Sequence, residues 1–179
     1  LVSEIGRWVL SEACRCAAQW PEDVAIAVNF SAVQFTDHRF PEFVSSVLRK
    51  TGLKPNRLEF EVTETALIDD DPDNLEMLLR FREMGIKVSL DDFGTGYSSL
   101  SQLRTFPFSK IKVDGSFVRD LGRDPSAAAV VHAVTSIGKI LGMSVVAECV
   151  ESEDQLAFLV TSGCTHIQGY LLGRPEAPE

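Results

Sequence analysis

The sequence predicts an α/β fold with a parallel sheet. It favours a TIM-type (β/α)8 barrel that is incomplete, with about six strands present and the first strands missing. Short apolar runs alternate with helical patterns along the chain, as repeated βα units do. A polar residue stands near the C-terminal end of each predicted strand, where barrel enzymes build their sites. The fingerprint GxGxxG does not follow the first strand, which weakens the alternative of a doubly wound open sheet.

The predicted elements begin with a helix, because Ile5, Trp8 and Val9 follow a helical period from the start of the chain. Apolar runs with the length of buried strands then recur at 24–30, 58–63, 86–91, 109–114, 144–148 and 165–168. A closed barrel has eight strands. We therefore expect residues 1–179 to form a single domain that lacks its N-terminal part.

Three predicted helices between these strands carry both start and stop signals. Asp71 followed by Pro72 starts the first helix, and the same pair at 124–125 starts the second. Ser152 and Gln155 form a capping box at the start of the third. Each pattern ends at a glycine, namely Gly85, Gly142 and Gly163.

Composition excludes several classes of protein. The formal net charge is −9, and nucleic-acid backbones require clustered Lys and Arg, so we expect no DNA or RNA partner. No apolar run reaches the ~18 residues of a membrane span, and no basic leader precedes an apolar stretch. The four cysteines lack the spacing of a disulfide framework or a zinc site, which favours a cytoplasmic location. Cys149 and Cys164 are interpreted as small core residues.

The polar strand residues predict one shared site. Strand side chains alternate between faces, so a polar residue flanked by apolar ones points away from them, toward the barrel axis. The residues in this position are Asn29, Glu61, Asp91, Lys112, Glu148 and Gln168. An inward-facing carboxylate without a partner is too costly to be structural filler.

The oxygen donors in this set predict a metal site. Asn29, Glu61 and Asp91, together with the adjacent Asp92, offer hard oxygen ligands that suit Mg²⁺ or Mn²⁺. Carboxylates so close would otherwise repel one another, and two adjacent Asp residues can share two cations. Two such cations could clamp the attacking and leaving oxygens of a phosphodiester.

The other polar residues have predicted roles around a phosphate. Lys112 offers a cation for the phosphate or the bound water, with Asp114 on the same strand face to orient it. Glu148 is either a second-metal ligand or the base that takes the water proton, and Gln168 places the water or a substrate oxygen.

Structural alternatives exist for single residues of this set. Asn29 alone could make a strand-end hydrogen bond, and Lys112 alone could be an exposed strand charge. Glu59 is interpreted as an outer, solvent-reaching residue or as the partner of a basic group.

These residues occur in an order that resembles the signatures of EAL domains, the barrel phosphodiesterases of bacterial cyclic di-GMP signalling. The matching segments are Asn29-Phe-Ser31, Glu61-Val-Thr-Glu64, Asp91-Asp-Phe-Gly-Thr-Gly-Tyr-Ser-Ser99, Lys112-Val-Asp114, Ala147-Glu-Cys-Val-Glu151 and Gln168-Gly-Tyr170. The resemblance runs from the opening helix to Gly173-Arg-Pro175, nearly the whole chain.

The resemblance implies a set of roles. It implies that Asn29, Glu61 and Asp91 bind one metal, and that Asp92 and Glu148 serve a second. Lys112 would assist the nucleophilic water, with Gln168 in the same site, and Glu64 would steady the Asp-Asp-Phe-Gly loop, which in the family couples the site to dimerisation. The implied reaction is cleavage of one phosphodiester of cyclic di-GMP to linear pGpG with Mg²⁺ or Mn²⁺.

The chain departs from the family pattern at two points. The Glu-Ala-Leu motif, whose Glu is a metal ligand in the family, is absent. Cys149 stands where the family usually has Gly, and its side chain could crowd the second metal or be absorbed on the outward face.

These departures lead to further expectations. We expect weak or no hydrolysis by the 179-residue chain itself, and a homodimer formed through the exposed sheet edges near 24–30 and 165–168. Regulatory domains are expected in the parent protein, and the sequence leaves its attachment to a membrane open. The alternative function is a cyclic di-GMP sensor or protein-interaction module without hydrolysis.

Overall fold

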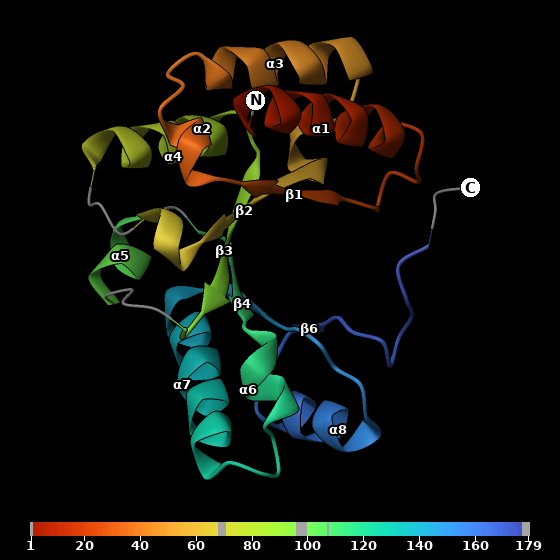
Figure 1. Cartoon of the computed structure of the whole chain (residues 1–179), viewed down its shortest axis with the longest axis vertical. Coiled ribbons are helices and arrows are strands. Elements are labelled where there is room, and N and C mark those ends of the chain that lie inside the picture. Colours follow the sequence, from red (N-terminus) through yellow and green to blue (C-terminus); the bar gives the residue numbers. More distant parts are fainter. Residues whose placement is uncertain (1, 68–70, 96–99, 107, 177–179) are drawn as a thin grey trace. The chain divides into compact units, whose positions relative to one another are not determined.

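The computed structural model describes residues 2–67, 71–95, 100–106 and 108–176 (Figure 1). The chain forms two compact units. Unit 1 comprises Leu1–Leu90 with Tyr97–Phe108, and unit 2 comprises Asp91–Gly96 with Ser109–Glu179. Residues 96–99 of the predicted Asp-Asp-Phe-Gly loop lie outside the described residues.

A six-stranded sheet has the order β1-β2-β3-β4-β5-β6, which is the order along the chain. The pairs β1–β2, β4–β5 and β5–β6 are parallel, which confirms the predicted α/β class with its parallel sheet. The strands are β1 (Ile26–Phe30), β2 (Leu58–Thr63), β3 (Lys87–Phe93), β4 (Lys110–Val113), β5 (Ser144–Ala147) and β6 (His166–Ile167). Each overlaps a predicted run, and β3 extends two residues beyond its run.

The three helices predicted from their end signals are present as α4 (Pro72–Glu83), α7 (Pro125–Leu141) and α8 (Glu153–Thr161). Asp71 and Asp124 cap the first two of these by accepting from a backbone N–H, and Ser152 caps α8 in the predicted capping box. The opening helix is α1 (Val2–Ala17).

Other helical segments were not predicted from end signals. They are α2 (Ala32–Phe35), α3 (Phe40–Thr51), α5 (Leu100–Thr105), α6 (Gly115–Arg119) and the 3₁₀ turns η1 (Pro55–Arg57) and η2 (Glu64–Leu67). Arg39 stands at the N-cap of α3 without a side-chain cap, so the usual start signal is missing there. The helix ends at Gly52, whose φ of 73° is left-handed.

The core of unit 1 is built on aromatic rings. The ring centroid of Phe30 lies 4.8 Å from that of Phe35, 5.3 Å from those of Phe40 and Phe60, and 5.6 Å from that of Phe81. Side chains alternate along β1, so Phe30 points toward the helices and the neighbouring Asn29 is exposed.

Glu59 contradicts one sequence interpretation. Its side chain was expected to reach solvent or to pair with a basic group, but the residue is only 5% exposed. The solvent-reaching interpretation is therefore wrong. Position 59 pairs with Ala27 in the register of β1 and β2, within the sheet rather than at its rim.

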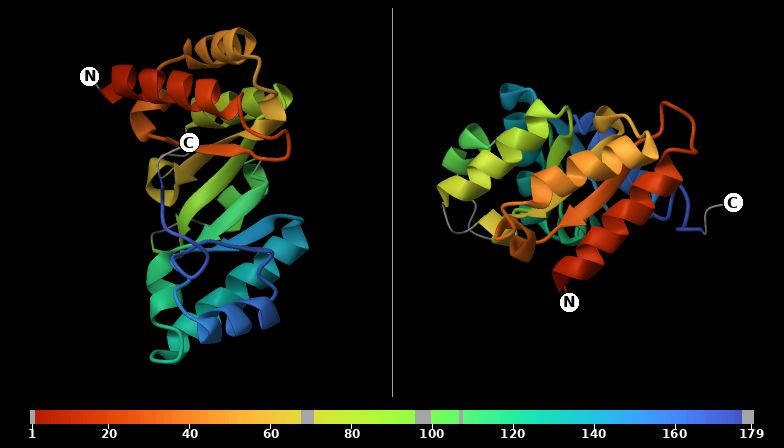
Figure 2. Two further views of the ribbon diagram at one scale, coloured as in Figure 1. Left: turned by 90° about the vertical axis from the view of Figure 1, so that its right-hand side faces the viewer. Right: turned by 90° about the horizontal axis from the view of Figure 1, so that it is seen from above.

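A cation-and-ring contact joins α1 to the segment around α3, and the two helices lie side by side (Figure 2). The Arg7 guanidinium lies 4.4 Å from the ring centroid of Phe43. Its Nη2 also donates to Asp37 Oδ2 at 2.5 Å. The hydrogen bond from Arg7 holds the pKa of Asp37 below its usual range.

Replacing Asp37 with Asn is expected to destabilise the protein by about 1 kcal/mol at neutral pH, a discounted value for a partly exposed ion pair. Because the pKa of Asp37 is lowered in the folded state, its stabilisation is complete above the unfolded pKa of about 4 and is lost as pH falls through the folded value. Urea unfolding of wild type and Asp37→Asn at pH 7 and below pH 3 measures this difference. A difference that persisted at the lower pH would contradict the prediction.

In unit 2, the long helix α7 packs against β4 and β5 (Figure 1). Gly138 of α7 faces Val145 of β5 so closely that any side chain at position 138 would overlap it. This close approach fixes α7 on β5, which directly precedes Glu148, beside β4, which carries Lys112. Among the described helices, none is both long enough and apolar enough to cross a membrane.

Candidate active site

Lys112 is the centre of a buried polar cluster in unit 2. Its Nζ lies 3.0 Å from Asp91 Oδ1 and 2.7 Å from Glu148 Oε1. The residue is only 5% exposed, and strand alternation turns it to the face of β4 opposite its neighbours Ile111 and Val113. The interpretation of Lys112 as an exposed strand charge is therefore wrong.

Asp91 and Asp92 stand near the end of β3 in unusual backbone geometry. The φ of Asp92 is 54°, in the left-handed region that few non-glycine residues adopt. Its backbone N–H donates to Asp91 Oδ1 at 3.0 Å. Such geometry clusters at functional sites, where the surrounding structure maintains it. Here it brings two consecutive carboxylates to the same cluster, although strand alternation alone would separate them.

Gln168 joins the cluster through Glu148. Its Nε2 donates to Glu148 Oε1 at 3.1 Å. The backbone around Gln168 is fixed too, because its N–H donates to the Ala147 carbonyl at 2.9 Å and its carbonyl accepts from the Val150 N–H at 3.1 Å. The predicted proximity of Lys112, Asp91, Glu148 and Gln168 is thus found in unit 2.

The carboxylates of this cluster fit a divalent cation. Asp91, Asp92 and Glu148 each offer one oxygen, and these oxygens all lie within 4.8 Å of one another. Carboxylate oxygens at such spacing are ligands that Mg²⁺ and Mn²⁺ accept. The ammonium of Lys112 contacts Asp91 and Glu148. The carboxylates therefore already have one positively charged group among them.

Electrostatics in the cluster reflect an excess of negative charge. Burial raises the pKa of Asp92, and the negative charges of Asp91 and Asp114 raise it further. Burial also acts to raise the pKa of Asp114, but hydrogen bonds from Ser116 and Gly115 and the positive charge of Arg119 together leave this pKa lowered.

Asp114 has a structural role that the sequence analysis did not assign. It follows the end of β4 as the N-cap of α6, where its Oδ1 accepts from the Ser116 backbone N–H at 2.9 Å and from the Ser116 hydroxyl. Its expected role in orienting Lys112 stays a prediction. Capping accounts for the position of Asp114, and its negative charge raises the pKa of Asp92.

In unit 1, Asn29 and Glu61 are neighbours. They are paired in the parallel register of β1 and β2, so their side chains leave the same face of the sheet. Asn29 is exposed and Glu61 is half-buried. Glu64 begins η2 and is 3% exposed.

Comparison with known proteins decides the family. The family model for the EAL domain matches residues 1–175 of the chain. The chain belongs to the EAL domain family. MucR of Pseudomonas aeruginosa, a bifunctional diguanylate cyclase/cyclic di-GMP phosphodiesterase, is 43% identical over 183 residues, which cover 100% of this chain and 27% of MucR.

Solved structures show the same fold. The PaMucR phosphodiesterase in a c-di-GMP complex matches this EAL domain with a TM-score of 0.94 and 43% identity, over 98% of this chain and 72% of that one. BlrP1 of Klebsiella pneumoniae, in a manganese/cy-diGMP complex, matches with a TM-score of 0.87 and 34% identity, over 97% and 45%. The chain spans 21% to 27% of the length of three of the curated relatives that it matches.

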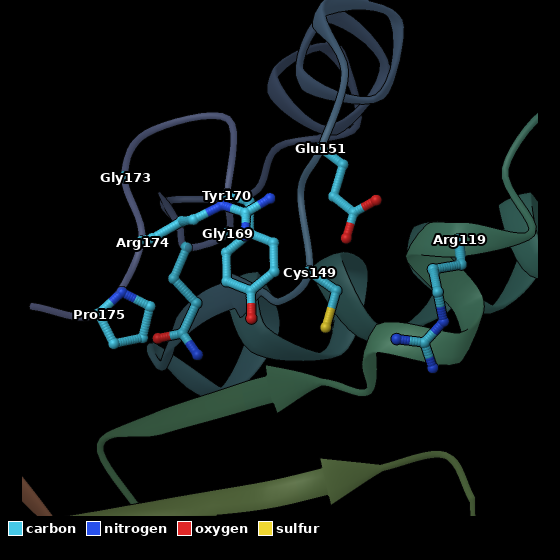
Figure 3. A pocket seen from close by; sticks show the side chains of 9 residues that line it. Arg119, Cys149, Glu151, Gly169, Tyr170, Gly173, Arg174 and Pro175 are labelled. Carbon is cyan, nitrogen blue, oxygen red and sulfur yellow. The ribbon is translucent and has the colours of Figure 1, made fainter.

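A pocket of about 620 Å³ adjoins the cluster of this EAL domain and shares Gln168 with it. Figure 3 shows Tyr170, Arg174 and Pro175 on one side and Arg119 on the other, with Cys149 between them. The Arg174 guanidinium lies 4.8 Å from the centroid of the Tyr170 ring.

The pocket residues reveal what sequence reasoning missed. Arg119 and Arg174 supply positive charge that was not assigned to the site, and no strand pattern marks them because they lie on a short helix and on a C-terminal loop. Cys149 lines the pocket and is half-buried, so its interpretation as a core residue is wrong. Cys164 is also only half-buried.

Proposed function

We propose that this EAL domain hydrolyses cyclic di-GMP to linear pGpG in a reaction that depends on Mg²⁺ or Mn²⁺. The observation that carries the proposal is the buried ammonium of Lys112 between Asp91 and Glu148, with Asp92 beside them. The named phosphodiesterase relative and the nucleotide complexes of the related structures support the same conclusion.

The residues of the cluster suit addition of water to a phosphodiester. The oxygen of water joins phosphorus, the bond from phosphorus to one ribose oxygen breaks, and that oxygen takes up a proton. Lys112 would hold the water or the phosphate by donating from its ammonium, while Glu148 would ligate metal or accept the water proton. Gln168 would keep the Glu148 carboxylate in place through its amide.

Asp91, Asp92 and Glu148 would hold the metal. When bound, Mg²⁺ or Mn²⁺ supplies the positive charge that an anionic phosphodiester needs in a site rich in carboxylates, and it acidifies water. The assignment of Asn29 and Glu61 as further ligands stays a prediction, as do the catalytic role of Asp114 and the loop-stabilising role of Glu64.

The proposed function is tested by incubating the protein with cyclic di-GMP and Mg²⁺ or Mn²⁺ and separating the products by ion-exchange chromatography. We expect pGpG to form only when the metal is present. The sequence also predicts weak hydrolysis by the 179 residues alone, so the same assay on a longer form of the protein belongs in the experiment. No pGpG from the longer form would contradict the proposal.

A cyclic di-GMP sensor without hydrolysis stays the alternative prediction. Calorimetry with cyclic di-GMP and Ca²⁺ distinguishes the two functions. Tight nucleotide binding without turnover under Mg²⁺ would favour the sensor, whereas turnover under Mg²⁺ or Mn²⁺ favours the enzyme.

Replacing Glu148 with Gln is expected to weaken Mn²⁺ binding by about 10-fold or more, because one anionic donor of the three becomes neutral. The change keeps the size of the side chain. Calorimetric titration with Mn²⁺ measures the effect. Glu153→Gln on the exposed first turn of α8 is the matched control. Equal Mn²⁺ affinity in the two variants would argue against Glu148 as a ligand.

We also propose a homodimer, a cytoplasmic location and regulatory domains in the parent protein. The end strands β1 and β6 in the sheet order support the dimer, since strand edges invite pairing. The length of the curated relatives supports additional domains. Light scattering that gave the mass of one chain at high concentration would contradict the dimer.

A further inference from the structure

Two residues that directly follow members of the cluster pack against each other. Gly115 follows Asp114, and Cys149 follows Glu148. A methyl group added at Gly115 would lie 2.5 Å from Cys149 Sγ and 2.9 Å from its Cβ. Real Cβ atoms do not approach neighbours so closely, so this contact leaves no space for a side chain at position 115.

A third neighbour is less restrictive. Arg119 Nη1 would lie 3.1 Å from the added methyl group. It is the end of a flexible, exposed side chain that can move away. The constraint on position 115 therefore comes from Cys149.

The backbone of Cys149 has little freedom to yield. Its φ is 55°, a left-handed value that non-glycine residues rarely adopt. The next residue is fixed on both sides, because the Val150 N–H donates to the Gln168 carbonyl at 3.1 Å and the Val150 carbonyl accepts from the Leu171 N–H at 3.0 Å. Gly169 packs so tightly on the Val150 backbone that it too excludes a Cβ.

We propose that Gly115 and Cys149 are a matched pair that positions the Glu148 carboxylate. A side chain at position 115 would displace Cys149. Because the peptide bond between Glu148 and Cys149 is planar and the chain beyond Cys149 is fixed, this displacement moves Glu148. Glu148 contacts Lys112 at 2.7 Å and Gln168 at 3.1 Å, so a small displacement breaks both contacts. The functional part of this inference rests on the proposed function.

The pair is tested by a double-mutant cycle of Gly115→Ala and Cys149→Gly in the full chain. Gly115→Ala alone is expected to lower the unfolding temperature by roughly 5 °C and to weaken Mn²⁺ binding about 10-fold. Cys149→Gly removes the atoms that the new methyl group would overlap, and glycine adopts the left-handed backbone readily. The double variant is therefore expected to recover both quantities to near those of Cys149→Gly alone.

Controls separate positioning from general stability. Cys164→Ala removes a half-buried thiol elsewhere in unit 2 and is expected to leave Mn²⁺ affinity unchanged in either background. The proposal is overturned if Gly115→Ala changes neither quantity, or if it is equally harmful with Cys and with Gly at position 149. It is also overturned if Gly115→Ala lowers the unfolding temperature while Mn²⁺ affinity stays constant.

The double-mutant test of the Gly115–Cys149 pair does not depend on hydrolysis of cyclic di-GMP. Absence of pGpG from the longer form of the protein would contradict the proposed function, whereas the Mn²⁺ titrations and the unfolding temperatures decide the role of the pair. Where hydrolysis is measurable, kcat is expected to fall more than KM rises in Gly115→Ala, since a misplaced Glu148 affects the reacting groups.

Discussion

Replacing Lys112 with methionine is expected to reduce the formation of pGpG by at least about 100-fold, while Mn²⁺ binding is retained. Methionine keeps much of the length of the side chain but removes the ammonium that lies between Asp91 and Glu148. The three carboxylates that would hold the metal remain. Hydrolysis assays at saturating Mn²⁺, with parallel Mn²⁺ titrations, separate the two effects.

The same replacement is expected to cost about 3 kcal/mol of stability in the absence of metal, because it leaves two buried or half-buried carboxylates without their ammonium partner. Lys139→Met, at an exposed position on α7, is the matched control and is expected to affect neither activity nor stability appreciably. Full activity in Lys112→Met would show that the ammonium is not required for the reaction.

Replacing Phe30 with alanine is expected to lower the free energy of unfolding by about 3 to 5 kcal/mol. The side chain is 2% exposed and contacts four other aromatic rings, so truncation opens a cavity that this rigid arrangement cannot fill. Urea unfolding monitored by circular dichroism measures the loss.

Val33→Ala provides the control, because Val33 lies on the neighbouring α2 and is 49% exposed. Its effect is expected to stay within about 0.5 kcal/mol. Phe30→Leu keeps most of the volume and is expected to cost less than Phe30→Ala. Similar losses for Phe30→Ala and Val33→Ala would show that the aromatic cluster does not dominate the stability of unit 1.

Much of the fold could be predicted because its signals are local. Asp-Pro pairs and a capping box mark the starts of α4, α7 and α8, since each cap satisfies backbone N–H groups within the next few residues. The helix α3 lacks a side-chain cap at Arg39, and α6 has an Asp cap but is only five residues long, so neither carried the combination of start and stop signals. Alternation along the strands also marked Lys112 and Asp91 as different from their apolar neighbours.

The sequence by itself marked the polar residues that could share one site, because strand periodicity and donor type are properties of short segments. Only the tertiary structure decided which of them touch. Lys112 contacts Asp91 and Glu148 through the arrangement of separate strands, and Gln168 reaches Glu148 across 20 residues of chain. Asp114 caps the helix α6, and Cys149 meets Gly115 instead of entering the core. Such contacts depend on left-handed backbone angles and on packing between distant segments, which no local pattern specifies.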